Sequence, residues 1–224
     1  MSSLEYHLQE LEIANNPNDR RRTMPDLQSH DQVIVDIGCG IGQTFIALEC
    51  TDRTCIGLDV DAEAINYGIE NFGNEIDFYL TDGVDIPLGP NSVDLVISRV
   101  ALPYMNIPKV LENVKGVLNE NGRIWFTVHS LELVKSWLKN AFRKKNFKDV
   151  IHKSYVLLNG YLLKYFGVLI PFINGTYESW QDEAAIIKIL KRNGIEATTR
   201  KIGKNVCIDG RVTGSCDESN DSKK

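Results

Sequence analysis

Cysteine is scarce in this sequence, and the spacing of the cysteines argues against both disulfide bonds and a structural zinc site. The five cysteines in the 224 residues are Cys39, Cys50, Cys55, Cys207 and Cys216. Their number is odd and no two have C-x-x-C spacing, which argues against a disulfide framework and against a zinc site. We therefore expect no metal, and we expect free thiols in a reducing, cytoplasmic compartment.

An excess of positive charge and an export signal are also missing. The formal net charge is −5. Proteins that hold a phosphate backbone are usually basic, so we expect no DNA partner and disfavour an RNA partner. The first 16 residues, MSSLEYHLQELEIANN, lack the basic segment and apolar run of a signal peptide.

The hydrophobic residues, 43% of the chain, are sufficient for a full core and follow a regular rhythm. Apolar runs typical of buried strands alternate with amphipathic stretches typical of helices, which predicts an α/β fold with a parallel sheet. The expected strands are 32–37, 54–60, 76–80, 93–98 and 123–129, and the expected helices are 42–50, 62–72 and 107–122. A helix at 182–194 and a strand pair at 195–203 and 205–212 close the chain.

The rhythm divides the chain into five segments. Residues 1–30 are predicted to be an N-terminal helical cap, with Asp19 as the N-cap of a second helix. Residues 31–130 form the core, and 131–180 are a mostly helical insert. Residues 181–212 are expected to complete the core, and 213–224 are expected to be a polar, disordered tail.

A glycine-rich turn follows the first strand, in the stretch VIVDIGCGIGQTF at residues 33–45. Glycine lets a ligand lie against bare backbone where a strand feeds a helix. The dinucleotide fingerprint would need a third glycine where this chain has Gln43. Asp36, two residues before Gly38, would repel a pyrophosphate and would suit a ligand that carries an amine.

This D-x-G-x-G pattern resembles motif I of the class I S-adenosylmethionine-dependent methyltransferases, of the type 11 kind found in ubiquinone and menaquinone biosynthesis. The resemblance implies a Rossmann-like seven-stranded, mostly parallel sheet with an antiparallel last strand, helices on both faces and a helical lid inserted after strand 5. It also implies S-adenosylmethionine as the cofactor. The cofactor-binding residues it implies are Asp36, Gly38, Cys39, Gly40, Gly42, Asp59, Val60, Asp82, Gly83 and Ser98.

The order of these residues carries the prediction. Asp36, Gly38 and Gly40 are expected at the methionine end, Asp59 at the ribose and Asp82 at the adenine. Taken singly, the glycines could form an ordinary turn, and the aspartates could be loop or turn residues. Their joint order and spacing favour a cofactor site.

Three residues are candidates for the acceptor side: His129, Tyr104 and Arg99. His129 ends the fifth strand, where ligands bind in open α/β sheets, but it could equally be a hydrogen-bonded structural residue. Tyr104 stands where the similar enzymes carry Leu-His-His, and it could simply be a pocket wall. Arg99 could pair with the cofactor carboxylate, an anionic substrate or a nearby acid.

The insert combines basic and apolar stretches. Residues 135–153 hold seven Lys or Arg against one acid, and residues 155–173 are apolar at 14 of 19 positions. Asn159, Gly160 and Lys164 interrupt the second stretch, so we expect no transmembrane helix. The insert could be a lid, a channel for an apolar or lipid-like acceptor, or a peripheral membrane contact through 135–173.

The sequence as a whole predicts an enzyme that transfers a methyl group from S-adenosylmethionine to a small-molecule acceptor. A nucleotide-dependent oxidoreductase is disfavoured by the glycine spacing and by Asp36. Two alternatives stay open: a protein that binds S-adenosylmethionine without turnover, and a methyltransferase acting on RNA or protein. Methyl transfer has no obligatory catalytic residue that would exclude the former.

Overall fold

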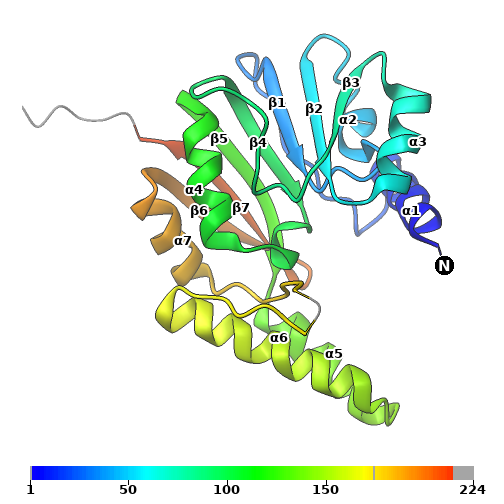
Figure 1. Ribbon diagram of the computed structural model, residues 1–224, viewed down its shortest axis with the longest axis vertical. Coiled ribbons are helices and arrows are strands. Elements are labelled where there is room, and N and C mark those ends of the chain that lie inside the picture. Colours follow the sequence, from blue (N-terminus) through cyan, green and yellow to red (C-terminus); the bar gives the residue numbers. More distant parts are fainter. Residues whose placement is uncertain (1, 174, 214–224) are drawn as a thin grey trace, which may run out of the picture.

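A sheet of seven strands organises the computed structural model, which describes residues 2–173 and 175–213 (Figure 1). The strand order is β3-β2-β1-β4-β5-β7-β6, and β7 runs antiparallel to both of its neighbours. The other strand pairs are parallel, so the predicted fold class is confirmed. The strands are β1 Val33–Ile37, β2 Thr54–Asp59, β3 Ile76–Leu80, β4 Val93–Arg99, β5 Leu118–His129, β6 Ile195–Ile202 and β7 Asn205–Val212.

Helices cover both faces of the sheet, as the apolar strands require. The helices are α1 Ser3–Asn15, α2 Gln43–Ala47, α3 Ala62–Phe72, α4 Ile107–Val117, α5 Leu131–Arg143, α6 Phe147–Phe166 and α7 Glu183–Arg192, with a short 3-10 turn η1 at Leu102–Tyr104. Successive residues of β1 point to opposite faces. Ile34 packs in the cluster that contains Phe45 of α2, whereas Val35 packs in the cluster that contains Val114 of α4.

Two sequence expectations about helices were wrong. The helix expected at 107–122 ends at Val117, because Leu118 is extended, fully buried and paired with Val93 of β4. Asp19 caps no helix: its side chain accepts hydrogen bonds from the backbone and guanidinium of Arg21. The described residues 16–32 contain no helix or strand, so the predicted N-terminal cap holds one helix, α1.

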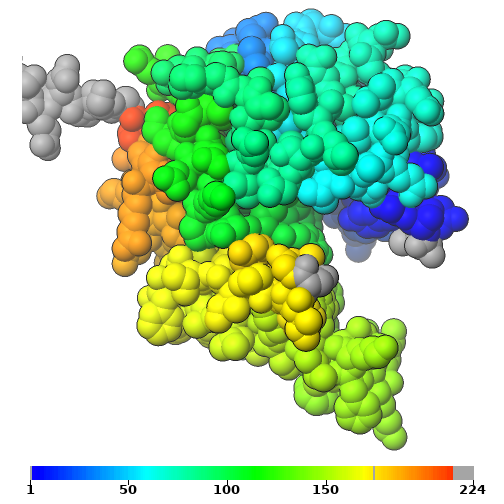
Figure 2. All heavy atoms as spheres, in the orientation of Figure 1, coloured from blue at the N-terminus to red at the C-terminus, as the bar shows by residue number. Residues whose placement is uncertain are grey.

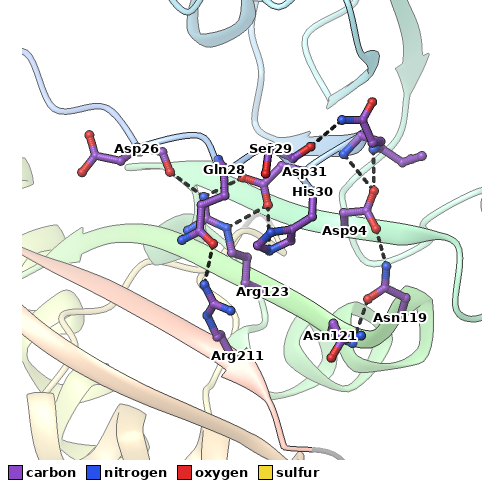
Figure 3. Close-up of polar contacts among 12 residues, drawn as sticks. Asp26, Gln28, Ser29, His30, Asp31, Asp94, Asn119, Asn121, Arg123 and Arg211 are labelled. Atoms are coloured by element: carbon purple, nitrogen blue, oxygen red, sulfur yellow. Dashed lines mark hydrogen bonds and ion pairs between the residues drawn. The ribbon is translucent and has the colours of Figure 1, made fainter.

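The edge of the sheet where the parallel strands begin carries a closed polar network (Figure 3). Arg123 of β5 is buried and donates to both carboxylate oxygens of Asp31, at 2.9 and 2.7 Å. Burial raises the pKa of Asp31, but hydrogen bonds from Arg123 and the backbone of Gln28 bring it below its usual range. Asp94 accepts from the backbone N–H groups of residues 32 and 33 at 2.9 and 2.8 Å. This network fixes where β1, β4 and β5 begin.

The helices α5 and α6 pack against each other across the opposite edge of the sheet (Figure 1). Gly160 of α6 lies directly against the buried ring of Trp180, with no room for a Cβ. Asn159 is buried and bonds to the backbone of Ile170 and Glu178, which holds the segment after α6 in place. We call this segment, residues 167–173 and 175–182, the strap. No helix among the described residues has the length and apolar content needed to cross a membrane. The predicted tail lies largely outside the described residues.

Candidate active site

A cavity of about 730 Å³ opens where the parallel strands end. Side chains that follow β3, β2, β1, β4 and β5 in turn line it, together with α1, α5 and the strap. The strand order reverses between β1 and β4, and open α/β sheets bind their ligands at such a point. Volumes of roughly 300–1,000 Å³ are usual for small-molecule sites.

The glycine loop lies at the centre of this edge. Gly38 and Gly40 have φ values of +80° and +57°, a conformation that residues with a Cβ rarely adopt. A Cβ on Gly38 would overlap the side chain of Ala101, and one on Gly40 would overlap the ring of His7. The loop therefore needs glycine both for its backbone shape and for the close approach of its neighbours.

Asp59 ends β2 and holds the loop in place. Its Oδ2 accepts a hydrogen bond from the Gly40 backbone N–H at 2.7 Å, and its Oδ1 accepts from Asp61 at 3.0 Å. The side chain also lines the cavity, as do Gly38 and the exposed Val60. The predicted ribose position is thus at the cavity wall and is rigidly supported.

Asp36 lies beneath the loop rather than in the cavity. It is completely buried, and among the described residues neither of its carboxylate oxygens has a hydrogen-bond partner of good geometry. Burial raises the pKa of Asp36 to about 7, with Asp59 adding to the rise and the Thr44 hydroxyl and the Arg99 charge opposing it. A buried carboxylate without a partner is costly, so nearby positive charge would be favoured here.

Some of the other predicted cofactor residues line the cavity, and the rest are buried behind its wall. Asp82 lines the cavity and also accepts from the backbone of Val84 at 3.0 Å. Ser98 is buried and accepts from the backbone of Leu102, which positions the turn after β4. Cys39 is buried and burial raises its thiol pKa, which agrees with a packing residue rather than a nucleophile. Cys39, Gly40, Gly42, Gly83 and Ser98 do not contribute to the cavity lining among the described residues.

The helix α1 supplies cavity residues that the sequence did not identify. His7 is buried against the loop, its Nε2 lies 3.4 Å from Asp61, and its Nδ1 has no partner among the described residues. Tyr6 and Glu10 line the cavity from the same helix. The Ser2–Glu5 capping box predicts a helix start here, but no sequence signal shows which sheet edge that helix covers.

Arg99 pairs with a nearby acid, which is one of the three partners that the sequence left open. Its guanidinium lies 3.2 Å from Glu10 of α1, and the arginine side chain is 6% exposed. The pair fastens α1 to the end of β4 beside the cavity. Arg99 is therefore already neutralised by a carboxylate, although it remains part of the cavity wall.

His129 and Tyr104 meet at the other end of the cavity. Their rings are edge-on at 5.4 Å between centroids, and the His129 ring is also edge-on to Trp137 of α5 at 4.9 Å. Burial and the nearby charge of Lys153 lower the pKa of His129 to about 4. Burial and Glu178 raise the pKa of Tyr104. At neutral pH the site thus holds a neutral imidazole and a protonated phenol.

Comparison with known proteins shows which proteins this chain resembles. Residues 35–126 match the methyltransferase domain family. A probable S-adenosylmethionine-dependent methyltransferase of Saccharomyces cerevisiae is 31% identical over 42% of this chain and 35% of its own length. An uncharacterized methyltransferase of Bacillus subtilis is 27% identical over 43% of this chain and 40% of its own length. This segment of the chain is similar to S-adenosylmethionine-dependent methyltransferase domains. The matches span less than half the length of these curated relatives.

Solved structures agree with this methyltransferase fold over nearly the whole chain. One is a chain from the complex between the Trm112 methyltransferase activator of Haloferax volcanii and a candidate methyltransferase. It has a TM-score of 0.63 at 15% identity and covers 94% of this chain and 93% of that one. The magnesium protoporphyrin IX methyltransferase of Synechocystis, solved with bound S-adenosylhomocysteine, has a TM-score of 0.53 at 18% identity, covering 80% and 74%.

The strap closes the methyltransferase cavity over His129. Gln181 exchanges two hydrogen bonds with the His129 backbone, at 3.1 and 2.8 Å, and Ser179 donates to the Pro103 carbonyl at 3.0 Å. Tyr177 lines the cavity, whereas Trp180 packs away from it between α5 and α6. Asp182 caps α7, and its side chain accepts a hydrogen bond from the backbone N–H of Ala185.

Glu178, by contrast, caps nothing and anchors the strap to α6. Its buried carboxylate lies 3.0 Å from Lys153 and 3.3 Å from His152. The Lys153 ammonium also lies over the Trp137 ring, at 4.8 Å from the centroid. This chain of contacts couples the strap to the aromatic wall beside His129.

Proposed function

We propose that the protein transfers a methyl group from S-adenosylmethionine to a small, mainly apolar acceptor that carries one hydroxyl or amine. The observation that carries the proposal is the single cavity that joins the glycine loop and Asp59 to the His129–Tyr104 pair. One end has the residues expected for the cofactor, and the other has polar groups suited to an acceptor. Direct transfer of a methyl group requires mainly that the cofactor and the acceptor are held close together and aligned.

The residues at the loop end fit the cofactor. Asp59 presents carboxylate at the cavity wall for a diol, and Gly38 leaves backbone exposed there. His7 lines the cavity, and its unpartnered Nδ1 leaves polar capacity for an amino-acid end. The cofactor supplies a methyl group on a sulfonium, which is already a good leaving group. The protein must align the acceptor and exclude water.

The acceptor end selects for apolar bulk. Leu133, Trp137 and Tyr177 line it, and the polar side chains of His129, Tyr104 and Asn205 lie among them. Arg99 and Glu10 neutralise each other, so the wall presents little uncompensated charge. A compact acceptor, including a lipid-like one, suits this lining better than a strand of RNA, which would need a basic surface.

His129 can accept a proton although its pKa is only about 4. Such a group is a weak base, but it is already neutral and therefore free to accept at neutral pH. The proton of a hydroxyl becomes strongly acidic once its oxygen bonds to carbon as an oxonium, so a weak base is sufficient at that moment. The protonated phenol of Tyr104 can donate a hydrogen bond that fixes the acceptor oxygen or nitrogen.

Transfer of labelled methyl groups tests the proposal. The protein is incubated with methyl-labelled S-adenosylmethionine and either the apolar or the aqueous small-molecule extract of cells. We expect labelled product from the apolar extract, and a loss of about 100-fold or more with His129→Gln. Binding of S-adenosylhomocysteine without labelling of either extract would favour a protein that binds without turnover. Labelling of RNA or protein fractions alone would contradict the small acceptor.

A further inference from the structure

Exposed apolar side chains concentrate in one part of the described chain. Nine of its fifteen exposed large hydrophobic residues lie between 142 and 173, on α5, α6 and the strap. These residues are Phe142, Phe147, Ile151, Leu158, Tyr165, Phe166, Val168, Ile170 and Ile173. Two are almost fully accessible: Phe147 is 77% exposed and Ile173 is 94% exposed. Scattered exposed apolar residues are ordinary, but a group of this size indicates an interaction surface.

Four of these residues form a regular stripe on α6. Phe147, Ile151, Leu158 and Tyr165 follow at intervals of four, seven and seven residues, which places them on one helical face. The opposite face of α6 holds its buried residues, Val156, Asn159, Gly160 and Leu163. The stripe therefore points outward from the fold. We call this stripe the outer apolar face.

Positive charge lies on α5 and at the end of the outer apolar face that begins with Phe147. The exposed basic residues there are Lys135, Lys139, Arg143, Lys144, Lys145 and Lys148. Within the described residues none of these six is in an ion pair, whereas Lys153 and Lys164 are paired with Glu178 and Asp182. The end of α5 and the start of α6, where most of this charge lies, project from the body of the molecule (Figure 2).

We infer that the outer apolar face and its basic border dock on the surface of an anionic lipid bilayer. Basic side chains are attracted to anionic head groups, and apolar side chains between them enter the head-group and acyl boundary. A second copy of this chain fits poorly, because a symmetric contact would bring the same lysines together. Aliphatic side chains such as Ile151, Leu158 and Ile173 favour hydrocarbon over the stacking that nucleic acid bases need.

The strap connects the insert to the cavity. It is bonded to the buried face of α6 through Asn159, and it reaches the cavity wall at Tyr177. Delivery of a lipid-like acceptor rests on the proposed function, but the docking itself does not and can be measured without any cofactor.

Vesicle binding tests the docking. The full chain is mixed with vesicles of phosphatidylcholine alone or with added phosphatidylserine, and bound protein is measured by sedimentation at low and high salt. Each lysine near an anionic surface changes partitioning about fivefold, so Lys144→Glu/Lys145→Glu/Lys148→Glu should lose at least about 100-fold. The matched control reverses three exposed charges on α7, as Lys188→Glu/Lys191→Glu/Arg192→Glu, and should lose far less.

A second pair of variants tests the apolar contribution. Phe147→Ser/Ile151→Ser should lose binding to anionic vesicles, whereas Ile69→Ser, at a half-exposed isoleucine of α3, should not. Circular dichroism melting shows that each variant is folded. The inference is overturned if the wild type does not bind anionic vesicles at low salt, or if both insert variants bind like the wild type. It is also overturned if the stripe variant instead abolishes a dimer seen by light scattering.

Discussion

The buried polar groups at the two edges of the sheet differ in whether they have hydrogen-bond partners. At the edge where the strands begin, Arg123 and Asp31 bond to each other, and Asp94 accepts hydrogen bonds from backbone N–H groups (Figure 3). At the edge where the strands end, Asp36 and one ring nitrogen of His129 have no partner among the described residues. The first arrangement is complete without a ligand, and the second is not.

This difference separates structural from functional chemistry in one domain. Unsatisfied buried polar groups cost free energy, so they persist where something else repays the cost. His7 and His129, whose Nδ1 atoms are unpartnered, lie on two sides of one cavity. The unpartnered groups support the proposed ligand site by an argument that does not depend on the glycine motif.

The largest expected effect is the loss of the pair at the closed edge. Arg123→Met leaves the buried carboxylate of Asp31 without its bidentate partner and should cost about 3–5 kcal/mol of unfolding free energy. Urea denaturation measures this. The double variant Arg123→Met/Asp31→Leu should recover much of the loss, and S-adenosylhomocysteine should bind both variants as it binds the wild type. Weakened binding in the folded variants would show that the two edges are coupled.

Asp36→Asn should act in the opposite direction and depend on pH. The pKa of Asp36 is about 7 in the folded protein against an ordinary 3.8, so the folded state binds an extra proton between these values. Stability contributed by this group is therefore present below pH 4 and is lost as pH rises through 7. Without ligand, the variant should be more stable than the wild type by about 2–4 kcal/mol at pH 8 and by little at pH 4. Equal stability differences at both values would contradict this.

Gly38→Ala tests the loop against a glycine of no special geometry. A side chain in the left-handed conformation costs about 1–3 kcal/mol, and the added Cβ would meet Ala101. We expect that loss in thermal denaturation, together with weaker S-adenosylhomocysteine binding. Gly89→Ala is the control, because a Cβ there meets nothing within 4 Å among the described residues. Similar losses in both variants would contradict the claim that the glycine loop specifically requires glycine at position 38.

The smallest expected effect is the pH dependence of methyl transfer from His129. Because its pKa is about 4, the imidazole stays neutral from pH 8 to about pH 5.5. Ionisation of His129 should therefore cause no fall in the methyl-transfer rate in that range. The pH profiles of the wild type and His129→Gln should have the same shape. A fall with a midpoint near 6.5 that disappears in His129→Gln would mean that the ligand-bound ring is an ordinary, solvated histidine.

Local patterns were enough to predict the strands, the glycine turn and Asp59, because alternation and turn chemistry are written in neighbouring residues. The end of α4 was missed because burial of Leu118 beside Val93 is a tertiary effect. His7 and the Arg99–Glu10 pair were missed for the same reason, since only the packing of α1 places them at the cavity. Asp36 and Ser98 lie in β1 and β4 and are buried outside the cavity lining, so their predicted contact with the cofactor stays a prediction.

Two aspartates offer the most direct test of the central claim that the two edges have different purposes. Asp59 and Asp94 each accept two backbone hydrogen bonds, one aspartate at each edge of the sheet. Calorimetric titration with S-adenosylhomocysteine would compare the wild type, Asp59→Ala and Asp94→Ala. We predict binding to the wild type, a loss of at least about 10-fold in Asp59→Ala, and unchanged affinity in folded Asp94→Ala. Undiminished binding to Asp59→Ala, or none to the wild type, would contradict the account.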